Sequence, residues 1–147
     1  MKRTSYLLFF LVLISGCAPE RMDAERMSAP VQRFHVRYNS GSTESIIREA
    51  SERTRNPEDT AELEEEIRRV HQKLGRFVDV EAIHAFETSW RFFPTIVSVV
   101  TASRFENGQA TESFAFIQEG GRYRLVKYVA QISGEDEVGG ASKGSRD

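Results

Sequence analysis

The spacing of apolar residues changes at Phe77, and this change constrains the fold more than any other feature of the chain. Before Phe77, apolar residues recur every three or four positions, as on the buried face of a helix. After it they alternate with polar residues, and β-branched and aromatic types predominate. Helices followed by a series of antiparallel strands predict an α+β domain whose helices pack on one face of a sheet.

Two or three helices are predicted before the strands. The first starts at Ser28-Ala29-Pro30, Ser42 or Thr43 caps the second, and Asn56 caps the third, which Gly75 ends. Apolar residues at helical spacing predict the helical side of the core: Val31, Phe34, Tyr38, Ile46, Ile47, Ala50, Leu63, Ile67, Val70 and Leu74.

Four strands are predicted near residues 77–88, 94–106, 109–119 and 122–131. Asn107-Gly108 and Gly120-Gly121 are typical two-residue hairpin turns, because both turn positions favour a positive φ. These turns place Phe105 opposite Ala110 and a second ring, Phe116, opposite Leu125. The other face of this curved sheet then carries Ala102, Ala115, Val126 and Tyr128.

The first seventeen residues have the pattern of a secretory signal peptide. Lys2 and Arg3 precede an apolar run that is short for a membrane span, and Ser15-Gly16-Cys17 follows it. This ending resembles the lipobox of bacterial lipoproteins, in which the cysteine is acylated and becomes the first residue of the mature protein. The alternative is an uncleaved anchor in which Cys17 is incidental.

The likeness to lipoproteins implies a location as well as an anchor. Mature bacterial lipoproteins carry three acyl chains, such as palmitate, which hold a protein stably on a membrane. Ala18 stands where an aspartate would direct retention in the inner membrane of enterobacteria. The resemblance therefore implies a cell-envelope protein on the outer membrane, facing the periplasm.

These signals divide the chain into four parts. A signal peptide at residues 1–16 is followed by the lipidated cysteine and a tether at 17–29, an α+β domain at 30–132 and a disordered tail at 133–147. The full chain has a net charge of −2, and loss of Lys2 and Arg3 makes the mature net charge about −4. This charge argues against nucleic acid or an anionic lipid surface as a partner. Cys17 is the only cysteine, so we expect no disulfide and no thiolate metal site.

Core and turn residues of the domain resemble those of small uncharacterised bacterial lipoproteins. The resemblance covers about residues 30–132 and lies in Phe34-His35, Asn39-Ser40-Gly41, Ile46-Ile47, Leu74-Gly75, Phe105-Glu106-Asn107-Gly108, Phe114-Ala115-Phe116 and Leu125-Val126-Lys127-Tyr128. It implies a cystatin-like fold, also called nuclear-transport-factor-2-like. That fold hosts enzymes, binding modules and assembly components, so it does not define a function.

No catalytic motif, cofactor motif or metal-ligand spacing is found in the sequence, which favours a non-enzymatic protein. Enzymes of this fold use a histidine and a carboxylate inside the cone between sheet and helices, and His84 is the candidate for such a pocket. Alternation places the nearby acidic residues on the other face from His84, so a dyad would have to form across strands. His35 and His71 lie on predicted helices without a partner at metal-ligand spacing.

Aromatic residues near the first strand connection give the best candidate for a binding surface. Trp90, Phe92 and Phe93 would form an apolar patch for a partner if they are exposed, or a plug that closes the cone if they are not. Tyr128 on the second face of the sheet is a further candidate contact. The leading hypothesis is a periplasmic module that binds an envelope protein or a second copy of itself. The alternative is small-molecule binding, or hydrolase or isomerase chemistry, in the cone.

Overall fold

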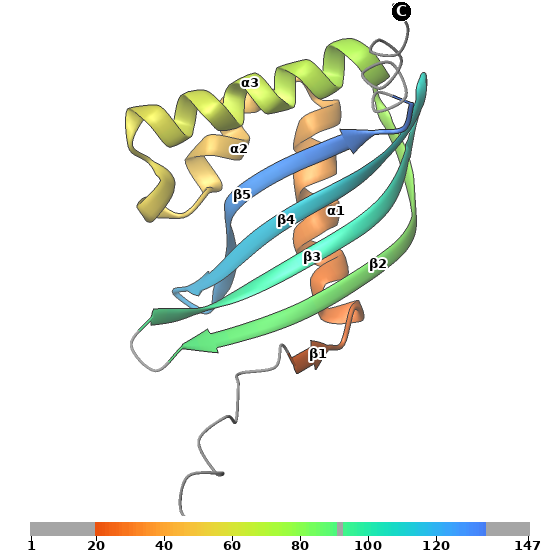
Figure 1. The fold of residues 1–147 in the computed structure, drawn as a ribbon. Helices are drawn as coiled ribbons and strands as arrows, with labels where there is room; N and C mark the ends of the chain where they lie inside the picture. Colours follow the sequence, from red (N-terminus) through yellow and green to blue (C-terminus); the bar gives the residue numbers. More distant parts are fainter. Residues whose placement is uncertain (1–19, 91–92, 135–147) are drawn as a thin grey trace, which may run out of the picture.

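The computed structural model describes residues 20–90 and 93–134, and Figure 1 shows helices packed on one face of an antiparallel sheet. Its elements run in this order: β1 (Glu20–Met22), α1 (Glu25–Asn39), α2 (Thr43–Glu49), the 3-10 turn η1 (Glu52–Thr54), α3 (Pro57–Leu74), β2 (Phe77–Trp90), β3 (Phe93–Phe105), β4 (Gly108–Glu119) and β5 (Arg122–Ile132). The predicted signal peptide, Cys17 and the tail from residue 135 lie outside the described residues.

The predicted α+β class is confirmed. Three helices precede four long strands that pair in sequential order, and the short β1 adds a fifth strand beside β2. Figure 1 shows α1 crossing behind the sheet, with α2 and α3 on the same side near β5. Within the described residues, no helix is long and apolar enough to cross a membrane.

The third helix follows its prediction closely, whereas the first begins earlier than predicted. Asn56 caps α3 by accepting a 2.9 Å hydrogen bond from the backbone N–H of Asp59. In α1, the side chain of Asp23 accepts a hydrogen bond from the N–H of Glu25, and Met27 is fully buried. These interactions start the helix at Glu25, three residues before the predicted start at Ser28 and within the segment predicted as the tether.

The turn between β3 and β4 differs from the prediction by a shift of two residues in register. Phe105 lies opposite Gly108 rather than Ala110, so Glu106 and Asn107 form the turn. The backbone N–H of Asn107 donates to the carbonyl of Leu74 at the end of α3, which fixes this turn against the helix. Because the shift is an even number, every side chain keeps its predicted face.

The turn between β4 and β5 forms at Gly120-Gly121 as predicted, and Phe116 lies opposite Leu125. A β-bulge then interrupts this pair of strands, because Ala115 lies opposite Lys127 and leaves Val126 as the extra residue. The bulge moves Tyr128 to the helix side of the sheet, where it is 3% exposed. The prediction that Tyr128 lies on the outer face and contacts a partner is therefore wrong.

The core lies between the helices and the concave side of the sheet. Within the described residues, the hydrophobic core runs from Met27 to Ile132. Rings fill the centre, where Phe34 lies 5.1 Å from Phe114 and 4.6 Å from Tyr128 between ring centroids. These contacts leave the middle of the cone packed with side chains.

Candidate functional site

A polar cluster is buried beneath α1, at the centre of the cone. Nε2 of His35 lies 2.9 Å from a carboxylate oxygen of Glu112 in β4, and these side chains are 2% and 0% exposed. The hydroxyl of Tyr128 donates to the other oxygen of Glu112 at 2.8 Å, and Thr101 donates to the first at 3.3 Å. Thr101 also bonds Ser103, so one buried carboxylate organises hydrogen bonds from three elements.

The environment of this cluster shifts the pKa values of its acidic groups. Burial raises the pKa of Glu112, but the hydrogen bond and charge of His35 and further hydrogen bonds from Ser103 and Tyr128 bring it below its usual value. Burial, together with the charge of Glu112, raises the pKa of Tyr128 well above that of a free phenol. Nδ1 of His35 has no hydrogen-bond partner among the described residues.

The cluster is a histidine–carboxylate pair of the kind expected in the cone, but it is closed to solvent. Phe77 stacks on the imidazole with 3.6 Å between ring centroids and covers one of its faces. A substrate has no route to side chains that are this deeply buried. The arrangement therefore links α1 to the sheet and specifies how they pack, as buried polar pairs do in some proteins.

The predicted pocket residue His84 lies elsewhere. It is exposed and lies opposite Val100 on the face of the sheet that the helices leave uncovered. A bulge after Val80 also places Asp79 on this outer face, contrary to the predicted alternation. The prediction of a site in the cone that uses His84 is therefore wrong.

The aromatic segment at the β2–β3 connection is described in part. The side chains of Trp90 and Phe92 lie outside the described residues, whereas the ring of Phe93 is 70% exposed. Phe93 therefore does not plug the cone, which was one of its two predicted roles. It borders an apolar hollow of about 460 Å³, lined by Arg53, Phe93, Pro94, Ile96, Ile117 and Val126.

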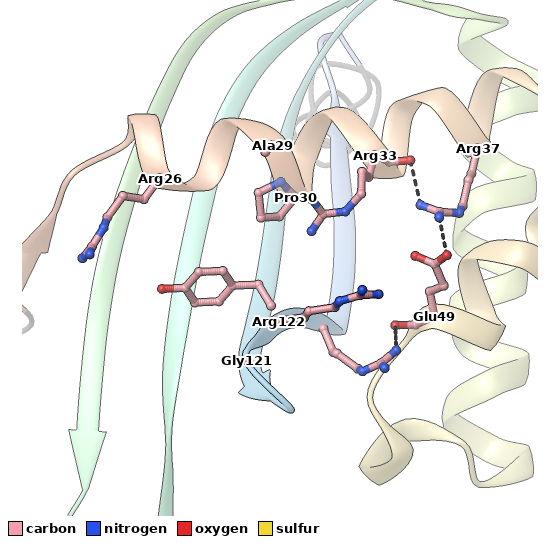
Figure 2. A pocket seen from close by; sticks show the side chains of 10 residues that line it. Arg26, Ala29, Pro30, Arg33, Arg37, Glu49, Gly121 and Arg122 are labelled. Atoms are coloured by element: carbon pink, nitrogen blue, oxygen red, sulfur yellow. Dashed lines mark hydrogen bonds and ion pairs between the residues drawn. The ribbon is translucent and has the colours of Figure 1, made fainter.

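A second hollow, which the sequence did not predict, lies between α1 and the β4–β5 turn. This arginine groove has a volume of about 690 Å³, and Figure 2 shows arginine side chains reaching into it from both sides. Its lining consists of Arg26, Ala29, Pro30, Arg33 and Arg37 of α1, Glu49 of α2, and Gly121, Arg122, Tyr123 and Arg124.

The charges of the arginine groove are largely uncompensated. Arg37 forms an ion pair with Glu49, whereas Arg124 forms one with Glu119 at 4.0 Å and donates to the backbone carbonyl of Glu49 at 3.2 Å. Arg26, Arg33 and Arg122 are exposed, and none has a side-chain ion pair or hydrogen bond within the described part of the chain. Three of the five arginines that line the groove therefore have no carboxylate partner, an arrangement that suits an anion with several oxygen atoms.

No metal centre forms in the described ranges, where no three histidine, cysteine or acidic side chains come together. Comparison of the chain with known proteins found no matching protein-family model, no matching curated protein and no matching solved structure. The function is therefore argued from the residues and the geometry given above.

Proposed function

We propose that this chain is an envelope lipoprotein, acylated on Cys17 and held on the outer membrane, whose domain binds another protein in the periplasm without catalysing a reaction. The basic start, the short apolar run and the lipobox-like ending support the anchor. The likeness of the core and turn residues to cystatin-like lipoproteins supports the same class of protein.

The observation that carries the binding role is the apolar hollow beside Phe93. Its lining comes from η1 and the ends of three strands, and Phe93 presents most of its ring to solvent. Burying a phenylalanine ring of this kind is favourable by about 1.5–3 kcal/mol. Exposed rings next to a shallow apolar hollow are typical anchor points at protein interfaces, and Arg53 at the rim would favour an acidic group on the partner.

A binding role is favoured over chemistry in the cone. The one histidine–carboxylate pair within the described residues is His35–Glu112, and it is sealed by Phe77 and the surrounding rings. A small-molecule site requires an open cavity with several polar groups around it. The open hollows at Phe93 and at the arginine groove lie instead at the surface.

The test is site-specific photocrosslinking in cells with the full chain. A photoreactive residue replaces Phe93, and the matched control carries it at Val36, an exposed residue of α1 outside the hollow. We expect an adduct with one envelope protein, or with a second copy of the chain, at position 93 only. A Cys17→Ser variant should lose the adduct with the envelope protein. Equal adducts at both positions, or adducts with lipid alone at position 93, would contradict the proposal.

A further inference from the structure

We propose that the arginine groove binds the phosphate groups of anionic phospholipids in the membrane that carries the acylated Cys17. The domain would then lie with the β4–β5 turn and the start of α1 against the bilayer. This inference rests on the lipid anchor of the proposed function and adds a second, electrostatic contact to it. The groove shares no lining residue with the hollow beside Phe93, although both lie at the end of the sheet where β3 begins.

The first argument is the short distance between the anchor and the fold. Only two residues separate Cys17 from Glu20, the first residue of β1, so at most about 10 Å of chain joins them. Glu20 lies opposite Glu87 of β2, and α1 begins three residues after β1. Arg26 therefore lies in the first turn of α1, close along the chain to the proposed anchor.

The second argument is that the groove lies at the same end of the sheet as β1. Glu87, which pairs with Glu20 of β1, also lies opposite Val97, and Val97 lies opposite Phe116 near the end of β4. Phe116 in turn pairs with Leu125, three residues after Arg122. Figure 1 shows β1, the start of α1 and the β4–β5 turn at the lower end of the sheet. An anchor at Cys17 thus brings this end to the membrane.

The third argument is chemical. Arg26, Arg33 and Arg122 are exposed and make no ion pair with other described residues, so their guanidinium groups are free to bind phosphate oxygens in pairs. A basic residue near an anionic bilayer surface contributes about 1 kcal/mol to binding. The ring of Tyr123 and the side chain of Pro30 line the same groove, and amphipathic rings are favoured at the headgroup level of membranes.

The net charge of the chain conceals this surface, because the lining of the groove holds five arginines and one acidic residue, Glu49. Glu62, Glu64 and Glu65 project from α3, which contributes no residue to the lining of the groove. Coulomb interactions between exposed groups are screened beyond about 10 Å at ordinary ionic strength. The local excess of arginine, rather than the overall charge of about −4, therefore determines what this end of the domain attracts.

A vesicle-binding titration tests the inference with the mature chain, residues 17–147, in which the substitution Cys17→Ser prevents acylation. Vesicles of phosphatidylethanolamine and phosphatidylglycerol are compared with vesicles of phosphatidylcholine alone. We expect binding to the anionic vesicles only, weakened by added salt. The variant Arg26→Gln/Arg33→Gln/Arg122→Gln should bind them at least about 100-fold more weakly.

The matched control is Arg68→Gln/Arg76→Gln/Arg104→Gln, which removes the same charge from exposed arginines outside the groove. It should change binding less than about threefold. The inference would be overturned by equal losses in the two variants, or by displacement with inorganic phosphate that exceeds the effect of chloride at the same ionic strength. Groove-dependent binding to polyglutamate without binding to vesicles would also overturn it. Because the titration needs no acylation and no partner protein, its failure is separate from failure of the proposed function.

Discussion

His35 of α1 and Glu112 of β4 are 77 positions apart in the chain, and their side chains meet at 2.9 Å in the middle of the core. Tyr128 of β5 bonds the same carboxylate, so the pair connects the first long helix with the two last strands. A buried carboxylate that keeps three hydrogen-bonding partners requires α1 to sit at one position along the sheet. The cluster therefore ties the placement of α1, and with it one wall of the arginine groove, to the sheet.

Removing the carboxylate should destabilise the domain strongly. Glu112→Leu leaves His35 and the hydroxyl of Tyr128 buried without their partner, and breaking a buried pair in this way costs about 3–5 kcal/mol. The triple variant His35→Phe/Glu112→Leu/Tyr128→Phe removes all three polar groups and should recover most of that loss. Urea denaturation of the variants measures both effects. If the triple variant were no more stable than Glu112→Leu, the unpaired polar groups would not be the cause of the lost stability.

The hydroxyl of Tyr128 has its own expected contribution. Tyr128→Phe keeps the ring in the core but removes one donor to the buried Glu112, which should lower the free energy of unfolding by about 1–3 kcal/mol. Tyr123→Phe is the matched control, because Tyr123 is only partly buried at the groove. If Tyr128→Phe had no greater effect than the control, the hydrogen bond to Glu112 would not contribute to stability.

Stability should fall at both ends of the pH range. The folded-state pKa of Glu112 is lowered, so its contribution is complete above the unfolded value of 4.5 and is lost as the pH falls below it. The folded-state pKa of Tyr128 is raised, so its contribution is complete below the unfolded value of 10.0 and is lost as the pH rises above it. Denaturation at a series of pH values should show a shallower acid decline for Glu112→Gln. An unchanged acid slope would contradict the role of Glu112.

The turn between α3 and β2 should tolerate no side chain at Gly75. Its φ is +73°, and a Cβ there would lie 2.9 Å from Nδ2 of Asn107 in the β3–β4 turn. Both the positive φ and this contact make Gly75→Ala unfavourable by about 1–2 kcal/mol. Gly41→Ala has a similar φ but no atom within 4 Å, so it isolates the contribution of the backbone. If thermal denaturation showed the same loss of stability for the two variants, the contact with Asn107 would make no contribution to it.

Much of the fold followed from the sequence because the local signals agreed with the tertiary structure. The cap at Asn56, the stripe of α3 and the Gly120-Gly121 turn depend on neighbouring residues alone, and each is present. The β4–β5 bulge has no such local signal, since alternation continues on both sides of Val126. The sequence therefore does not predict the bulge, and the predicted face of Tyr128 is wrong for that reason.

The sequence does contain a signal for the buried pair of His35 and Glu112. His35 lies four residues after Val31 and one after Phe34, within the apolar stripe of α1, and Glu112 lies at an inward position between Ala110 and Phe114. A polar residue at a core position in each of two facing elements predicts a buried pair. The arginine groove had no such signal, because its residues come from segments about 90 positions apart and need the fold to meet.

Both proposals depend on the state of Cys17, and intact mass spectrometry of the protein purified from bacterial envelopes measures it directly. The account predicts a chain that begins at Cys17, lacks residues 1–16 and carries the mass of three acyl chains. A Cys17→Ser chain processed in parallel should carry none of that mass. A protein that retains residues 1–16, or one that begins elsewhere with an unmodified thiol, would contradict the lipid anchor on which the account rests.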